Sequence, residues 1–170
     1  MMFKADLVSK GNGNPWDDHS LGQVVGIVIS YSSTSIHSLR FLCVKGNIQQ
    51  MSEQHGSSGG NSEMILLDYP NEFLTAVHGI RDCALSTYSG TIKSLTFVTN
   101  KAIYGPIGQQ RSGNNGIAFG FKFAGKEPRN LIVGFYGTVY GGFLNELGVY
   151  VRTPTTGQPE EYKPLVKRAI

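Results

Sequence analysis

The stretch Ile36-His-Ser-Leu-Arg-Phe-Leu-Cys43 recurs as Ile92-Lys-Ser-Leu-Thr-Phe-Val-Thr99, and less closely as Leu144-Asn-Glu-Leu-Gly-Val-Tyr-Val151. The copies lie about 54 residues apart, so three such units account for nearly all of the 170 residues. Apolar residues largely alternate within each copy, which is typical of a half-buried strand. Leu39 is an exception, because it is out of phase with Ile36. The repeat predicts one structural unit used three times.

The rest of the chain predicts an all-β protein. Further alternating or apolar runs lie at 24–31, 63–67, 73–77, 116–123 and 131–136, with turn residues between them. The 22 glycines have no fixed period, which suits tight turns between short strands. Three four-stranded sheets that close around a pseudo-threefold axis would form a β-prism, and such closure protects the sheet edges.

The length favours a single domain. We expect residues 1–10 to be a lead segment, residues 11–152 to form the domain, and residues 153–170 to be a tail. The tail is indicated by a shift to proline, threonine and glutamate after Arg152.

Composition argues against several classes of function. The net charge of +3 is small and is concentrated near the C-terminus, so nucleic acid is not an expected partner. No apolar run has the length of a membrane span or a signal peptide, so we expect a cytoplasmic protein without membrane insertion. Cys43 and Cys83 are expected to be free thiols. No metal-ligand or nucleophile spacing is present, so we expect neither an enzyme nor a cofactor.

A glycine-rich stretch, Gly141-Gly-Phe-Leu-Asn145, leads into the third copy of the repeat. In one interpretation it clamps a sugar hydroxyl, with the amides of Gly142 and Phe143 donating and Asn145 accepting. In the other it is a plain hairpin in which Asn145 caps its own turn. The chemistry of the residues alone leaves both open.

Four stretches carry a family resemblance: Gly11-Asn-Gly-Asn-Pro-Trp-Asp-Asp18, His55-Gly-Ser-Ser-Gly-Gly60 with Leu67-Asp-Tyr-Pro70, Thr99-Asn-Lys-Ala-Ile-Tyr-Gly-Pro-Ile-Gly108, and Gly134-Phe-Tyr-Gly137 with Leu147-Gly-Val-Tyr-Val151. With this order and spacing, residues 11–152 resemble a jacalin-related lectin domain of the mannose type. The resemblance implies a β-prism I fold, metal-independent binding of monosaccharide units, and a homo-oligomer.

The resemblance also implies where sugar binds. The family site combines a glycine amide near the N-terminus, here Gly13, with a Gly-x-x-x-Asp loop, here Gly141 to Asn145 with donors at Gly142 and Phe143. The sequence departs from the family at Asn145, where an aspartate is expected. An amide offers one acceptor oxygen where a carboxylate accepts two hydroxyls, a loss on the order of 1–2 kcal/mol. Glu146 is not expected to replace the carboxylate, because strand neighbours point to opposite faces.

The other two copies place His37 and Lys93 at the position of Asn145. Gly60 keeps the backbone side of a possible second sugar site, but His37 cannot supply a carboxylate acceptor. His37, His19, His55 and His78 are interpreted as plain surface residues, and Trp16 as a packing residue.

Galactose preference in the family goes with a cleaved N-terminus that frees a glycine amine. Ten residues precede Gly11, so glycans containing mannose or glucose are the expected partners. The alternative function is a protein-interaction module on a lectin scaffold.

Overall fold

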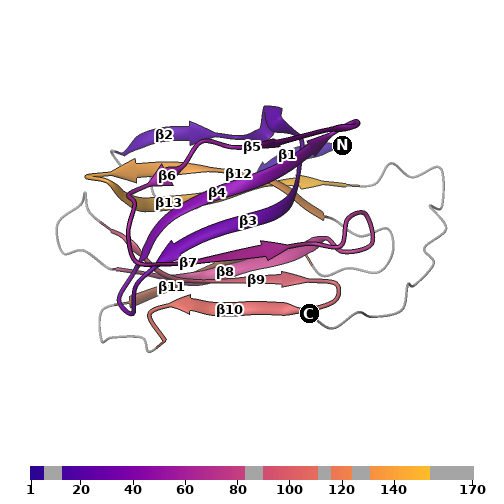
Figure 1. Cartoon of the computed structure of the whole chain (residues 1–170). Helices are drawn as coiled ribbons and strands as arrows, with labels where there is room; N and C mark the ends of the chain where they lie inside the picture. The colour runs from indigo at the N-terminus through magenta and orange to yellow at the C-terminus, as the bar shows by residue number, and fades with distance from the viewer. Residues whose placement is uncertain (6–12, 83–89, 111–115, 124–130, 154–170) are drawn as a thin grey trace.

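The computed structural model describes residues 1–5, 13–82, 90–110, 116–123 and 131–153. Within them the chain forms thirteen strands and one short 3-10 helix, His19–Leu21 (Figure 1). The strands are β1 (Met2–Ala5), β2 (Asn14–Asp17), β3 (Gln23–Tyr31), β4 (Ile36–Lys45), β5 (Ile48–Met51), β6 (His55–Gly56), β7 (Asn61–Leu66), β8 (Leu74–Asp82), β9 (Ile92–Thr99), β10 (Ile103–Gly108), β11 (Gly116–Lys122), β12 (Leu131–Tyr140) and β13 (Phe143–Arg152). The prediction of an all-β protein is confirmed.

The strands form three antiparallel units, each centred on one long pair: β3 with β4, β8 with β9, and β12 with β13. The first unit adds β7 beside β3, and β5 and β6 beside β4. The second adds β11 and β10, and the third adds β2 and β1. One residue pair, Ile132 with Leu74, joins the second and third units into an eight-stranded sheet. In Figure 1 the third unit lies at the top and the second at the bottom, with β3 and β4 between them.

The N-terminal residues belong to the third unit. β1 pairs with β13 along its whole length, and the Phe3 ring meets the Phe123 ring edge to face at 6.2 Å between centroids. Residues 2–5 of the expected lead segment thus form an edge strand beside β13. Thr153, the first residue of the predicted tail, donates its amide to the Met1 carbonyl at 2.7 Å. Residues 6–10 and 154–170 lie outside the described part of the chain.

Each long strand pair carries a β-bulge near the start of its second strand. The residues left without a register partner are His37 on β4, Lys93 on β9 and Asn145 on β13. A bulge adds one residue and changes the phase of the side chains that follow. This is why Ile36 and Leu39 are both fully buried although they are out of phase in the sequence. The three residues aligned by the repeat thus occupy equivalent structural positions.

The centre of the core is aromatic and is shared by the three units. Phe41 on β4, Phe97 on β9 and Phe135 on β12 are each 0% exposed. Phe135 stacks on Phe41 with 4.6 Å between ring centroids and meets the edge of Phe97 at 6.2 Å. The Phe135 ring therefore connects the cores of the three units.

A buried polar pair lies beside this core. The Trp16 ring stacks on the His55 ring, with centroids 3.9 Å apart and planes 8° apart. His55 Nε2 lies 2.7 Å from Asp18 Oδ2, and both side chains are less than one-tenth exposed. Trp16 is thus a packing residue, as predicted. The interpretation of His55 as a surface residue is wrong, because Trp16 covers its ring and Asp18 satisfies its nitrogen; His19 and His78 are exposed.

Cys43 is a buried free thiol on β4, as predicted. Burial, together with the negative charge of Asp18, raises the pKa of this thiol to about 12. Because the thiolate is the reactive form, Cys43 is an inert core residue. Cys83 lies outside the described residues.

Candidate functional site

The loop between β12 and β13 is a two-residue hairpin turn. Tyr140 pairs with Phe143, and the two glycines between them have positive φ angles, 58° at Gly141 and 82° at Gly142. Positive φ at both central positions is what a tight turn of this hand requires, and glycine adopts it without strain. A Cβ on Gly141 would meet no atom within 4 Å, and one on Gly142 would meet only Ser57 Cβ at 3.9 Å. The backbone of this turn is therefore open to a ligand.

Asn145 lies three residues after the turn, at the bulge of β13. The residue is only 5% exposed, and its side chain makes no hydrogen bond to another described residue. Its amide oxygen and nitrogen are not among the fully buried atoms that lack a partner, so the amide can be reached from outside. Among the described residues, nothing supports the interpretation in which Asn145 caps its own turn.

Gly13 reaches the same place from the other side of β12. A Cβ on Gly13 would lie 2.8 Å from Thr138 Cβ and 2.9 Å from the Val139 carbonyl oxygen, so only glycine fits there. Thr138 and Val139 are the two residues of β12 that flank the bulge at Asn145. The structure thus brings Gly13, the glycine turn and Asn145 to one end of β12.

The predicted second site has the same layout around β3. Gly60 has φ 75°, and a Cβ there would lie 2.3 Å from the Tyr31 carbonyl oxygen, as Gly13 lies against Val139. It would also lie 3.3 Å from His37 Cε1. The His37 ring therefore lies where a ligand of Gly60 would bind.

At the third equivalent position the bulge residue is already engaged. Lys93 Nζ lies 3.1 Å from Asp82 Oδ2, and the Thr91 hydroxyl donates to the same oxygen. Of the three bulges, the one at Asn145 is therefore the best suited to a neutral ligand.

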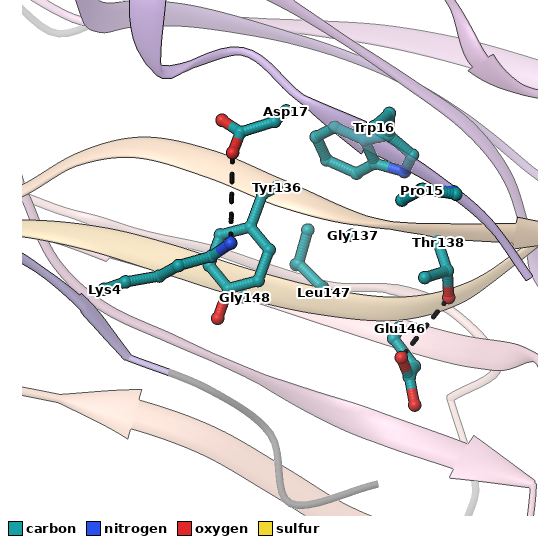
Figure 2. Close-up of a pocket in the computed structure, with 10 residues that line it drawn as sticks. All are labelled: Lys4, Pro15, Trp16, Asp17, Tyr136, Gly137, Thr138, Glu146, Leu147 and Gly148. Carbon is teal, nitrogen blue, oxygen red and sulfur yellow. Dashed lines mark hydrogen bonds and ion pairs between the residues drawn. The ribbon is translucent and has the colours of Figure 1, made fainter. Parts of the chain in front are cut away.

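Next to Gly13 the outer face of the sheet is hollowed, and the sequence did not indicate this. The hollow has a volume of about 420 Å³ and lies over β12, β13 and β2. Figure 2 shows Lys4 and Asp17 at one end and Thr138 and Glu146 at the other. Its position depends on the register between strands that are far apart in the sequence. No short sequence signal could have revealed it.

The charged side chains of Lys4 and Asp17, at one end of this hollow, are held in place by contacts within the protein. Lys4 Nζ lies 3.9 Å from Asp17 Oδ2 and 3.8 Å from the centroid of the Tyr136 ring. Burial alone would raise the pKa of the Asp17 carboxyl, but hydrogen bonds from Tyr150 and His19 outweigh burial and hold its pKa below the usual value. Asp17 therefore stays ionised and keeps Lys4 over the Tyr136 ring.

Two other kinds of site find no support in the described residues. They contain no group of three or more histidine, cysteine or acidic side chains that could hold a metal ion. They also contain no helix long and apolar enough to cross a membrane.

Comparison with known proteins agrees with this geometry. The family model described as "Jacalin-like lectin domain" matches residues 6–150. Jacalin-related lectin 9 of Arabidopsis thaliana is 35% identical over 86% of this chain and 45% of its own length. The protein RESTRICTED TEV MOVEMENT 1 from the same plant is 34% identical over 86% of this chain and 85% of its own length.

A solved structure, AcmJRL, a mannose-binding jacalin-related lectin from Ananas comosus, aligns with a TM-score of 0.73. The two are 28% identical, and the alignment covers 90% of this chain and 99% of that one. The chain spans less than half the length of some curated relatives that it matches, such as Jacalin-related lectin 9. Its three-unit architecture is the β-prism I fold of these lectins. The chain belongs to the family of jacalin-like lectin domains.

Proposed function

We propose that this domain binds glycans of the mannose or glucose type, without a metal ion, at the site formed by Gly13, Gly142, Phe143 and Asn145. The observation that carries the proposal is the open glycine turn beside a buried amide with no partner among the described residues. A sugar ring needs backbone donors at close range and a side-chain acceptor, and this end of β12 offers both. The mannose-binding relative from Ananas comosus supports the sugar type. The domain would act by binding and not by catalysis.

Phe143 is the register partner of Tyr140. Its amide lies at the position where the hairpin ladder draws a hydrogen bond, whereas the Gly142 amide lies within the turn. Gly142 is thus the donor on which the proposal rests most directly.

We expect Gly142→Pro to abolish binding of methyl α-mannoside, as measured by titration calorimetry. Proline removes the amide donor and fixes φ near −65°, far from the observed 82°. The matched control is Gly141→Asn, because asparagine tolerates positive φ and its Cβ would meet no atom within 4 Å. The control should keep both the fold and the affinity. If the unaltered protein binds neither mannoside nor glucoside at millimolar concentration, the proposal is wrong.

Asn145→Asp should tighten mannoside binding by roughly tenfold, because a carboxylate accepts two hydroxyls in charge-assisted hydrogen bonds. The measurement is the same titration, with Asn145→Ala expected to be weaker than the unaltered protein. An aspartate variant that binds no better would show that Asn145 is not the acceptor. The natural affinity would then be set elsewhere in the loop.

A second candidate function is binding of a protein partner. It is favoured by Asn145, which departs from the family acceptor, and by the relative RESTRICTED TEV MOVEMENT 1, whose name refers to no sugar. Tight binding of a protein by a domain that ignores sugars would support this function. For either function we propose a homo-oligomer in the cytoplasm, because several weak sites on one assembly gain avidity.

A further inference from the structure

The hollow shown in Figure 2 adjoins the proposed sugar site. Thr138 belongs to both. It lines the hollow, and its Cβ lies 2.8 Å from the position that a Cβ on Gly13 would take. A molecule held at Gly13 and the glycine turn can therefore continue along the outer face of β12 and β13.

Glycines create the depth of this hollow. A Cβ on Gly148 would lie 2.1 Å from Tyr136 Cζ, so the Tyr136 ring lies directly on the backbone of β13. A Cβ on Gly137 would lie 2.1 Å from the Glu146 carbonyl oxygen. Larger residues at either position would fill the space or displace the strands. The floor is thus main chain and one flat ring.

The two ends of the hollow differ in what they can bind. At the far end Lys4 already covers the Tyr136 ring, with its Nζ 3.8 Å from the ring centroid. At the near end, next to Gly13, the half-buried Glu146 carboxylate lies 3.4 Å from the Thr138 hydroxyl, beside the apolar ring of Pro15. The near end therefore offers a carboxylate acceptor, a hydroxyl and an apolar surface.

These groups favour a neutral polyol over an anionic ligand. The Glu146 carboxylate repels phosphate and sulfate, while it accepts two hydroxyls well. A volume of about 420 Å³ is within the usual range for small-ligand sites. Glu146 lines the hollow, whereas Asn145 is not among the residues that line it.

We propose that the hollow is an extension subsite for the second sugar ring of an oligosaccharide whose first ring lies at the glycine turn. Glu146 is the specificity-determining acceptor of this subsite. The inference rests on the proposed sugar site, since the first ring delivers the second to the hollow. It explains how a domain with a weakened primary acceptor can still discriminate between glycans, because a carboxylate one residue after Asn145 lines the position of the next ring.

Glu146→Gln tests the proposal. Titration calorimetry with methyl α-mannoside and with a mannose trisaccharide should show an unchanged affinity for the monosaccharide and a loss of about tenfold for the trisaccharide. The matched control is Glu53→Gln, the same change at an exposed glutamate outside the hollow, which should alter neither affinity. Amide chemical shifts of Thr138, Glu146 and Gly148 should move on addition of the trisaccharide and not on addition of methyl α-mannoside.

The inference fails if Glu146→Gln changes both affinities equally, or changes neither, while the unaltered protein binds both sugars. In that case the primary site stands and the subsite does not. If the unaltered protein binds neither sugar, the proposed function fails first and the subsite with it. Thermal unfolding of each variant checks that the hairpin is intact.

Discussion

Phe135→Ala is expected to lower the free energy of unfolding by about 3–5 kcal/mol. The Phe135 ring is 0% exposed and contacts Phe41 face to face and Phe97 edge to face, so its removal leaves a cavity where the three sheets meet. The backbone of β12 is held by β13 and β2 on its two sides and cannot collapse to fill that cavity. Urea denaturation followed by circular dichroism measures the loss.

Tyr140→Ala is the control for this measurement. It removes an aromatic ring from the same strand, but Tyr140 is 43% exposed at the end of the hairpin. Its effect on the free energy of unfolding should stay within about 0.5 kcal/mol. Equal losses in the two variants would show that the rings do not meet in a shared core.

His55→Ala should destabilise the protein by about 3 kcal/mol or more, although the change is far from the proposed sugar site. The change removes the partner of Asp18 Oδ2, 2.7 Å away, and leaves a carboxylate buried beside the core. It also removes the ring on which Trp16 stacks. The loss of unfolding free energy can be measured by urea denaturation at neutral pH.

The structure supplies a matched control for this pair. His19 Nδ1 also lies 3.0 Å from an aspartate oxygen, that of Asp17, but the His19 side chain is 49% exposed and that of Asp17 is 38% exposed. Removing a solvent-exposed pair costs less than about 1 kcal/mol. If His19→Ala is as destabilising as His55→Ala, burial does not explain the role of the His55 pair.

The repeated strand motif predicted three equivalent units because its apolar positions are the ones that pack in the core. The strands that contain Leu39, Leu95 and Leu147 all pack into the same core, so their apolar residues recur with a readable pattern. β5 was missed because all four of its residues are exposed, and an exposed strand has no such pattern. β1 was missed because its partner, β13, lies at the other end of the chain.

The burial of His55 could not be predicted from the sequence either, because it depends on tertiary contacts. Nothing near His55 in the sequence shows that Trp16 covers it, since the two meet only across the folded sheets. The candidate site was predictable in part: the turn chemistry of Gly141 and Gly142 is local, and Gly13 came from the family resemblance. The hollow beside it was not, because Thr138 and Glu146 face each other only through the register of β12 and β13.

The three bulges have a consequence for how such a domain can change over time. His37, Lys93 and Asn145 have no partner in the register of their strands and are not part of the apolar core. A new side chain at one of these positions alters what its loop presents without changing the register of the strand ladder. Each loop can therefore acquire or lose a ligand independently of the other two. Three copies of one unit give the chain three separate places at which recognition can evolve at little expense to folding.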